Sequence, residues 1–446
     1  MRRSRSTAST RRMPTVSRCA RASTIVASNE SRVTVQQVAP LHKSIATSRP
    51  CPVCDHRKGE VLHAQKFVLP EDQKLTAGYN VVVCEVCGAA FADTTVRQRH
   101  YDELYAQQSR YAAGPAAHAS DNDRDIARFR DMAAAVGRRV PDRSARIVDV
   151  GCANGQMLAA LAQLGFSSLS GIDPSPACAQ QAAAIPGVAA YAGSLTKMPE
   201  DVEPYDVVIL SHVLEHVRDV KASLTYLKRF VTASALIYVE VPDASRYVDF
   251  AWSPFQDFNT EHINHFSLVS LGNLMRQCGV RPVQAAAKEI LSAPGMPYPA
   301  IYCFAEVDAK VPATLEKDAD LKERLLAYIR VSRELMDGID ARLTENVRNG
   351  ASVIVWGTGE LTAKLLVDTA LRHANIVRFV DSNPINQGRV LRGIPIVAPS
   401  DLHSGDEIIV VASILHHEAI VRAVRALGLR NPVLRLTTGA LESPSS

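Results

Sequence analysis

The sequence predicts an α/β protein organised around an open parallel sheet. One observation is the stretch 148–156, where a buried apolar run enters a turn of small residues and then a helix over 157–164. A second is the alternation of strand-like and helix-like segments as far as residue 241, which is typical of parallel sheets. A third is another strand–glycine–helix unit over 352–372. A chain of 446 residues is long enough for two or three domains.

The turn at 151–155 suits a bound cofactor. Gly151 and Gly155 lack a Cβ and can adopt backbone angles that are closed to other residues. The turn follows a parallel strand, and ligands of open α/β sheets usually bind at that end of the strands. An acid, Asp173, ends the next strand-like run, and the dinucleotide fingerprint G-x-G-x-x-G is absent here.

The pattern resembles motif I of the class I S-adenosylmethionine-dependent methyltransferases, D-x-G-x-G-x-G, with Ala153 in place of the middle glycine. The resemblance implies a Rossmann-like sheet with S-adenosylmethionine as cofactor. In that family the glycine turn cradles the methionine part, the acid after strand 2 holds the ribose, and residues after strand 3 flank the adenine. The cofactor-binding residues expected on this basis are Asp149, Gly151, Asn154, Gly155, Asp173, Ser194, Leu195 and His212.

Five strands and one further helix are expected in this domain. The strands are expected at 146–150, 168–173, 188–192, 205–211 and 235–241, with the helix at 175–184. The run 211–217 resembles the His-x-Leu-Glu-His run that follows strand 4 in the same family. It places His212 and His216 near the cofactor, with His212 the candidate for lining the pocket and His216 interpreted as structural.

The polar stretch 258–267 follows strand 5, where this fold presents the substrate. Histidines and a carboxylate alternate with aromatic residues there, which suits a pocket that binds a polyhydroxy substrate and removes a proton. It resembles the His-Glu-His-x-x-Tyr-Phe-Ser motif of sugar C-methyltransferases, which also carry an amino-terminal four-cysteine zinc domain. Glu261, His262, Phe266 and Ser267 match that motif, whereas Asn259, Thr260 and His265 depart from it. A polar loop that only caps a helix starting near Ser267 is the structural alternative.

The candidate catalytic residues are therefore His262 as the base, Glu261 beside it and His265 as the competing base. His212 and Tyr111 are next in line. Three tyrosines in the helical run 97–130, at positions 101, 105 and 111, are further candidates for capping the substrate pocket, although such residues are more often packing residues.

Two C-x-x-C pairs lie before the sheet, namely Cys51 with Cys54 and Cys84 with Cys87. Paired knuckles of this kind predict a four-thiolate Zn²⁺ site, and such a closed site is structural because no position is left for a substrate. Disulfides are the alternative, but nothing in the sequence indicates secretion, and cytosolic thiols stay reduced.

The charge distribution gives no case for nucleic-acid binding. Residues 1–50 hold ten Lys or Arg and one acid, so the other 40 Lys or Arg face 45 acids. The basic, Arg- and Ser-rich start is expected to be disordered, to be a transit peptide or to precede a later true start such as Met13. No apolar run is long enough to span a membrane, so we expect a cytoplasmic, soluble monomer or homodimer.

The last hundred residues predict a second α/β unit. The expected elements are a strand over 352–356, the turn Gly357 to Gly359, a helix over 360–372 and a strand over 376–380 ending at Asp381. This order places glycines at the amino end of a helix. Sugar C-methyltransferases end in a comparable domain that holds the nucleotide of a nucleotide sugar, so this unit is expected either to bind a nucleotide or to act as a lid. The expected domains are a tail over 1–48, a zinc-binding module over 49–95, a methyltransferase domain over 96–310, a helical linker over 311–349 and a Rossmann-like domain over 350–440.

The function expected from these resemblances is methyl transfer from S-adenosylmethionine to a saccharide, such as a nucleotide-linked keto sugar, at carbon or oxygen. Two alternatives remain at this point. One is a nicotinamide-dependent oxidoreductase of nucleotide sugars that uses either glycine turn, and the other is a non-catalytic, zinc-containing nucleotide-binding protein.

Overall fold

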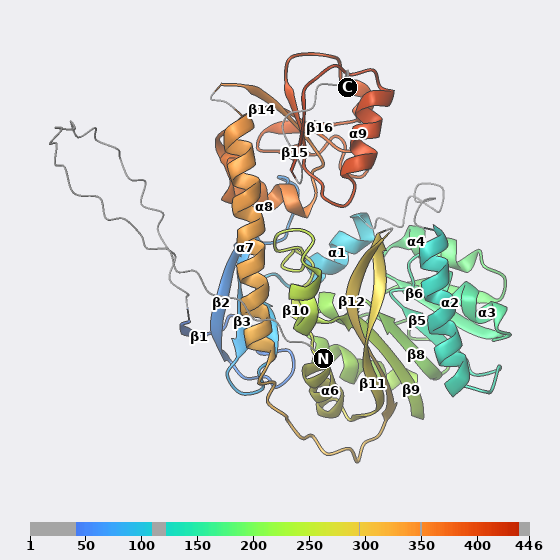
Figure 1. The fold of residues 1–446 in the computed structure, drawn as a ribbon. Coiled ribbons are helices and arrows are strands. Elements are labelled where there is room, and N and C mark those ends of the chain that lie inside the picture. The colour runs from blue at the N-terminus through green and yellow to red at the C-terminus, as the bar shows by residue number, and fades with distance from the viewer. Residues whose placement is uncertain (1–41, 109–121, 294, 348–349, 437–446) are drawn as a thin grey trace, which may run out of the picture. The chain divides into compact units, whose positions relative to one another are not determined.

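Three sheets organise the chain in a computed structural model (Figure 1). The structure describes residues 42–108, 122–293, 295–347 and 350–436, all within the unit Pro40–Ser446. Most of the basic tail, Tyr111 and residues 437–440 of the expected last domain lie outside the described residues. The α/β class predicted from the sequence is confirmed. No helix in the described ranges has the length and apolar character needed to cross a membrane.

The first sheet is antiparallel, with the order β1-β2-β3-β4-β10. Its strands are β1 (Ser44–Ala46), β2 (Lys58–Lys66), β3 (Gly78–Cys84), β4 (Ala90–Asp93) and β10 (Asn264–His265). The first strand begins before the expected module boundary at residue 49. The last strand comes from the polar stretch 258–267, and Asn264 and His265 pair with Phe91 and Ala90 of β4. The cysteine-containing module therefore supports the candidate substrate loop directly.

The central sheet has the order β11-β12-β9-β8-β5-β6-β7. The five strands from β9 to β7 are parallel, and β12 and β11 add an antiparallel edge. The bounds are β5 (Arg146–Val150), β6 (Ser168–Asp173), β7 (Val188–Ala192), β8 (Tyr205–Ser211), β9 (Val231–Pro242), β11 (Val280–Ala293) and β12 (Met296–Val307). Four of the five expected parallel strands have the expected bounds. β9 is longer, mainly at its start, where Val231 pairs with Tyr205 of β8 before the apolar run begins.

Helices cover both faces of the central sheet because apolar residues line both sides of its strands. Ile147 of β5 packs in the cluster with Met132 and Leu158, whereas its neighbour Val148 packs in the opposite cluster with Leu224 and Leu274. The helices concerned are α2 (Asn122–Arg139), α3 (Gln156–Gln163), α5 (Val220–Leu227) and α6 (Leu268–Gln277), with α4 (Pro176–Ala183) after β6 and α1 (Gln98–Gln108) before the sheet. Short 3-10 helices lie at η3 (Leu214–His216), η4 (Lys228–Phe230) and η5 (Ala244–Phe250).

The third sheet forms the carboxyl-terminal α/β unit, with the order β15-β16-β14-β13-β17-β18. Its strands are β13 (Ser352–Trp356), β14 (Asn375–Val380), β15 (Val390–Leu391), β16 (Ile394–Val397), β17 (Ile408–Val411) and β18 (Val433–Arg435). Its helices are α8 (Glu360–Asp368) and α9 (His417–Ala426), with turns η6 (Ala370–His373) and η7 (Pro399–Asp401). The expected helix over 360–372 therefore ends early and continues as a 3-10 turn.

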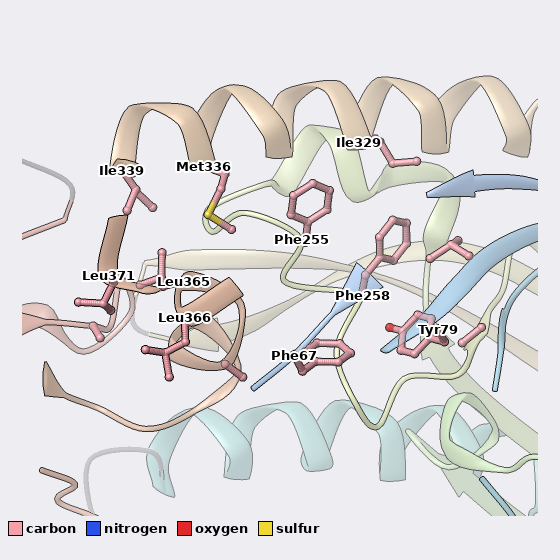
Figure 2. Close-up of a cluster of buried hydrophobic side chains, with 14 of the residues drawn as sticks. Phe67, Tyr79, Phe255, Phe258, Ile329, Met336, Ile339, Leu365, Leu366 and Leu371 are labelled. Atoms are coloured by element: carbon pink, nitrogen blue, oxygen red, sulfur yellow. The ribbon is translucent and has the colours of Figure 1, made fainter. Parts of the chain in front are cut away.

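One long helix, α7 (Leu321–Asn346), precedes the third sheet, and it begins ten residues later than the expected linker helix. The carboxylate of Asp318 accepts the backbone N–H of Leu321 at 3.0 Å, which satisfies a helix-terminal donor and fixes the start. One buried cluster joins α7 to its surroundings: Ile329 and Met336 of α7 lie near Phe255 and Phe258 of the candidate loop and Leu366 of α8 (Figure 2).

Candidate active site

The glycine turn follows the carboxyl end of β5, and the conformation of this turn depends on its small residues. Gly151 has φ +82°, and a Cβ on it would lie 2.8 Å from Cγ2 of Val213. Its N–H donates to the carbonyl of Ile172 at 2.7 Å, which holds the turn against β6. Ala153 also has a positive φ, of 47°, at the position where the family motif has its middle glycine.

Asp173 closes the turn from the neighbouring strand. Its Oδ2 accepts the N–H of Ala153 at 2.9 Å and its Oδ1 accepts the N–H of Ser175 at 2.8 Å. The side chain is buried, and burial raises its pKa although these two hydrogen bonds lower it. Burial, followed by the charge of Asp173, also raises the pKa of Asp149 to about 7. The expected ribose acid and the motif I acid thus form one buried pair of carboxyl groups.

The other expected cofactor residues gather around the same edge. Gly155 is the N-cap of α3, with φ +82°, and Asn154 precedes it in the turn. Ser194 and the buried Leu195 follow β7, where the N–H of Gly193 donates to the carbonyl of Asp173 at 2.9 Å. The chain therefore brings the expected adenine-flanking residues next to the expected ribose acid.

A buried ionic cluster that sequence reasoning missed lies where β8 and β9 end. Glu240 is 0% exposed, and its carboxylate accepts from Arg128 at 2.8 Å and from Tyr238 at 2.6 Å and pairs with Lys288. Burial opposes ionisation of Glu240, but His212 and Arg128 hold its pKa well below the usual range. A carboxylate within the apolar run 235–241 was the available signal, because unpaired charges are rarely buried.

His212 lies between this cluster and a second buried acid. Its backbone has φ +55°, its Nδ1 lies 3.0 Å from Oε1 of Glu215 and its Nε2 lies 3.5 Å from Oε1 of Glu240. Burial lowers the pKa of His212, but the two carboxylates outweigh burial and raise it overall. His212 is thus placed to carry a positive charge.

The polar loop meets η3 through a tyrosine. The hydroxyl of Tyr105 donates to Oε2 of Glu261 at 2.8 Å and lies 2.8 Å from Nδ1 of His216. The ring of His262 stacks edge-on against that of His216, with centroids 4.9 Å apart. Burial and the nearby His216 keep the pKa of His262 well below its usual value. His216, interpreted from the sequence as structural, therefore stands in the middle of the candidate catalytic group.

His265 lies apart from this group. It is 1% exposed, and its ring packs against Phe258 and Tyr247 with centroids 5.1 and 6.0 Å away. Burial lowers its pKa to about 3. The side chain fills the core under the loop, which argues against its expected role as the competing base.

The four knuckle cysteines converge as expected. Cys51 Sγ lies 3.5 Å from Cys87 Sγ, Cys54 Sγ lies 3.5 Å from Cys84 Sγ, and all four sulfurs lie within 4.8 Å of one another. The cysteines are free thiols, and these separations far exceed a disulfide bond of about 2.05 Å. Four sulfurs about 2.3 Å from one tetrahedral ion would be separated by roughly 3.8 Å, so the donor set fits Zn²⁺.

The carboxyl-terminal turn reproduces part of the expected pattern. Asp381 follows β14, but its Oδ2 already accepts the N–H of Thr358 at 3.0 Å and the side-chain amide of Asn386 at 3.0 Å. The first residue of α8, Glu360, is half-buried and accepts a hydrogen bond from the Thr260 hydroxyl of the polar loop. This sheet is thus coupled to the candidate active site through α8.

Residues 120–285 match a family model described as a methyltransferase domain. The matched segment contains the glycine turn, the parallel strands, η3 and the whole polar loop. This part of the chain is a methyltransferase domain. A search of curated proteins finds no match for the chain.

Many solved structures also match the chain at low identity. The 1,6-didemethyltoxoflavin-N1-methyltransferase of Burkholderia thailandensis is 14% identical, with 49% of this chain and 95% of that chain covered and a TM-score of 0.36. An S-adenosylmethionine-dependent methyltransferase of Mesorhizobium loti is 16% identical, with coverages of 36% and 91% and a TM-score of 0.31. One from Methanosarcina mazei is 16% identical, with coverages of 38% and 95% and a TM-score of 0.33. These values are too low to carry a substrate over to this chain.

Proposed function

We propose that the protein transfers a methyl group from S-adenosylmethionine to a saccharide, carried on a nucleotide. The observation that supports this most is the placement of a polar loop with Glu261 and His262 beyond the same sheet edge as the glycine turn, within a methyltransferase domain. S-adenosylmethionine supplies an electrophilic methyl carbon: an acceptor electron pair forms the new bond to it while the pair of the breaking S–C bond returns to sulfur. The chain has to align the acceptor and remove its proton.

On the cofactor side, the roles follow from the turn. Asp173 retains free lone pairs for ribose hydroxyls because each of its oxygens accepts one backbone hydrogen bond. Gly151 and Gly155 keep the turn tight, because a Cβ on Gly151 would meet Val213 and one on Gly155 would meet Ile185 and Ala182. In this proposal the backbone of the turn faces the methionine part. Ser194 and Leu195 flank the adenine.

On the acceptor side, His262 takes the proton from the acceptor and Glu261 binds sugar hydroxyls, held in place by Tyr105. We expect His262→Asn to lower kcat by about 10²–10⁴-fold, the usual contribution of a general base, without changing the affinity for S-adenosylhomocysteine. The matched control is His403→Asn, at an exposed histidine of the carboxyl-terminal unit. Unchanged turnover by the His262 variant would move the base elsewhere.

The four cysteines bind one structural Zn²⁺ in this proposal. No open coordination position remains for a substrate in a closed four-thiolate site. The ion stabilises the sheet to which β10 is added, and so it supports the loop without taking part in the chemistry.

The carboxyl-terminal unit is proposed to hold the nucleotide part of the acceptor. Gly359 has an ordinary φ of −81°, and a Cβ on it would meet nothing within 4 Å, so Gly359→Val should fold normally. We expect this variant to raise the KM for a nucleotide-sugar acceptor while the affinity for S-adenosylhomocysteine stays the same. An unchanged KM would leave this unit with the role of a lid.

Two other classes of function are separated by binding and product measurements. An oxidoreductase would bind NAD in place of S-adenosylhomocysteine. A non-catalytic protein would bind S-adenosylhomocysteine but methylate no member of a nucleotide-sugar panel. The cytoplasmic location expected from the sequence agrees with these substrates and is part of the proposal.

A further inference from the structure

Three side chains beside the cofactor edge offer one ligand atom each to a common point. They are Glu215 and His216 of η3 and His262 of the polar loop, and their ligand atoms all lie within 4.8 Å of one another. None of them belongs to the four-cysteine site. Two imidazole nitrogens and one carboxylate form a donor set that proteins use for divalent transition metals.

Glu215 is a buried carboxylate whose negative charge is only partly compensated by its neighbours. It is 1% exposed, and neither of its carboxylate oxygens accepts a hydrogen bond from a described residue. His212 contributes one charge partner, with Nδ1 at 3.0 Å from Oε1, and leaves the second oxygen without one. A buried carboxylate is expected to be paired, hydrogen-bonded or bound to a metal.

The hydrogen bonds of His216 fix which of its ring nitrogens is free. Nδ1 lies 3.1 Å from the carbonyl of Glu261, and a carbonyl oxygen can only accept, so Nδ1 carries the proton. In the neutral ring, Nε2 then presents a lone pair, and it lies 3.8 Å from Oε1 of Glu215, beyond hydrogen-bond length. Two acceptors that face each other at this distance leave room for a cation between them.

Tyr105 reinforces this tautomer from the other side. Its hydroxyl donates to Glu261, so its oxygen can accept from Nδ1 of His216 at 2.8 Å. Metal-binding histidines usually donate their other ring N–H to a partner of this kind, which orients the ring and raises its basicity.

His262 completes the group from the opposite side. Its Nδ1 is buried and has no hydrogen-bond partner among the described residues. Its backbone N–H donates to Oδ1 of Asn259 at 2.7 Å, and the next residue, Ile263, donates to the carbonyl of Glu215 at 2.8 Å. The loop and η3 are therefore joined by the backbone at the point where their side chains converge.

We propose that Glu215, His216 and His262 bind one divalent transition cation, such as Mn²⁺, at the acceptor side of the active site. Three protein ligands leave coordination positions for acceptor oxygens. With the cation bound, His262 uses its lone pair as a ligand and cannot also take a proton, so the cation replaces His262 in activating the acceptor. It would hold an acceptor hydroxyl and lower its pKa, with the proton passing to water, which favours methylation at oxygen over methylation at carbon. This catalytic role rests on the proposed methyl transfer, whereas the binding of the cation does not.

In the experiment, Mn²⁺ alone is added to the full chain, whose cysteine site is already filled with zinc. Binding of Mn²⁺ is followed by electron paramagnetic resonance. We expect one Mn²⁺ per chain, and we expect Glu215→Gln, His216→Asn and His262→Asn each to weaken binding by at least about 10–100-fold. Tyr105→Phe should weaken it by about 10-fold, because it removes only the group that orients His216. The matched control is His265→Asn, which should keep the Mn²⁺ affinity. His265 is three residues from His262 in sequence, but its ring is buried against Phe258 in the core.

Folding of every variant is checked by its affinity for S-adenosylhomocysteine. The proposal is overturned if the wild-type chain binds no Mn²⁺ at millimolar concentration, or if Glu215→Gln binds it as tightly as the wild type. It is also overturned if His262→Asn lowers kcat yet leaves Mn²⁺ binding intact, since His262 then acts as a base only. Mn²⁺ binding that depends on the three residues supports the site even where no saccharide is methylated, so failure of the proposed function is recognised separately.

Discussion

The guanidinium of Arg49 donates a 2.7 Å hydrogen bond from Nη2 to Oδ1 of Asn264. Arg49 lies between β1 and the first cysteine knuckle, and Asn264 opens β10 in the polar loop. The amide of Asn264 in turn donates to the carbonyls of Leu214 and Val217 on either side of the η3 residues Glu215 and His216. A single buried chain of hydrogen bonds thus runs from the cysteine module to the candidate catalytic group.

Asn264→Ala should therefore affect both stability and turnover. It leaves a buried arginine without its side-chain acceptor and two buried carbonyls without a donor, and we expect the free energy of unfolding to fall by about 3–5 kcal/mol. Urea denaturation measures this loss, with Asn375→Ala at an exposed asparagine as the control. A loss below 1 kcal/mol would show that the chain of hydrogen bonds is not what holds the loop.

The cysteine site predicts a metal-dependent module. Metal analysis should give about one zinc per chain, and Cys51→Ser with Cys84→Ser should abolish it and lower the unfolding temperature. Cys303→Ser, at a buried cysteine of β12, should keep the zinc. Unchanged zinc content in the double variant would remove the cysteines as ligands.

The two strand-terminal acids, Asp173 and Asp381, make a matched pair. Asp173→Ala should weaken the binding of S-adenosylhomocysteine by roughly 1.5–3 kcal/mol, the range for hydrogen bonds to a charged group. Asp381→Ala removes a carboxylate with similar backbone partners from the other glycine turn and should leave that affinity unchanged. Calorimetry that finds the reverse order would place the cofactor in the carboxyl-terminal unit. Gly151→Val should abolish binding, because φ at this position is +82° and the added side chain would collide with Val213 and distort the turn.

Asp149 predicts a pH dependence of stability in the cofactor-free protein. Burial first, and then Asp173, raises its pKa from 3.8 to about 7, so the folded chain keeps a proton that the unfolded chain has lost. The contribution of this group to the free energy of unfolding therefore falls as the pH rises from about 4 to 7, and the destabilisation is complete above that window. We expect Asp149→Asn to reduce the loss of stability between about pH 5 and pH 8 by up to about 3 kcal/mol. Urea unfolding at the two pH values checks this, and an identical pH dependence in both proteins would contradict it.

Much of the fold could be predicted because its signals are local. The strands from β5 to β8 and β13 have their expected bounds, since each is a short apolar run between turn residues. The pairing of β10 with β4 had no such signal: it joins two residues to a strand far earlier in the chain, and its polar sequence resembles a loop. The start of α7 was placed too early because the cap at Asp318 depends on tertiary contacts with Ser267 and Cys87.

The candidate site shows the same division. The glycine turn and the four cysteines are recognisable by spacing. Glu215 and Arg128 become notable only through burial and charge pairing, and the one sequence signal for Glu240 was its place within an apolar run. His265 is the weaker candidate for the base, because this histidine of a polar run has aromatic neighbours in space.

The most direct test of the central claim is a competition titration of the full chain with S-adenosylhomocysteine and NAD, followed by incubation with S-adenosylmethionine and a panel of nucleotide sugars. The account predicts that one S-adenosylhomocysteine binds per chain, that NAD does not displace it, and that mass spectrometry finds one panel member with an added methyl group, absent with His262→Asn. Binding of NAD without binding of S-adenosylhomocysteine would contradict the account.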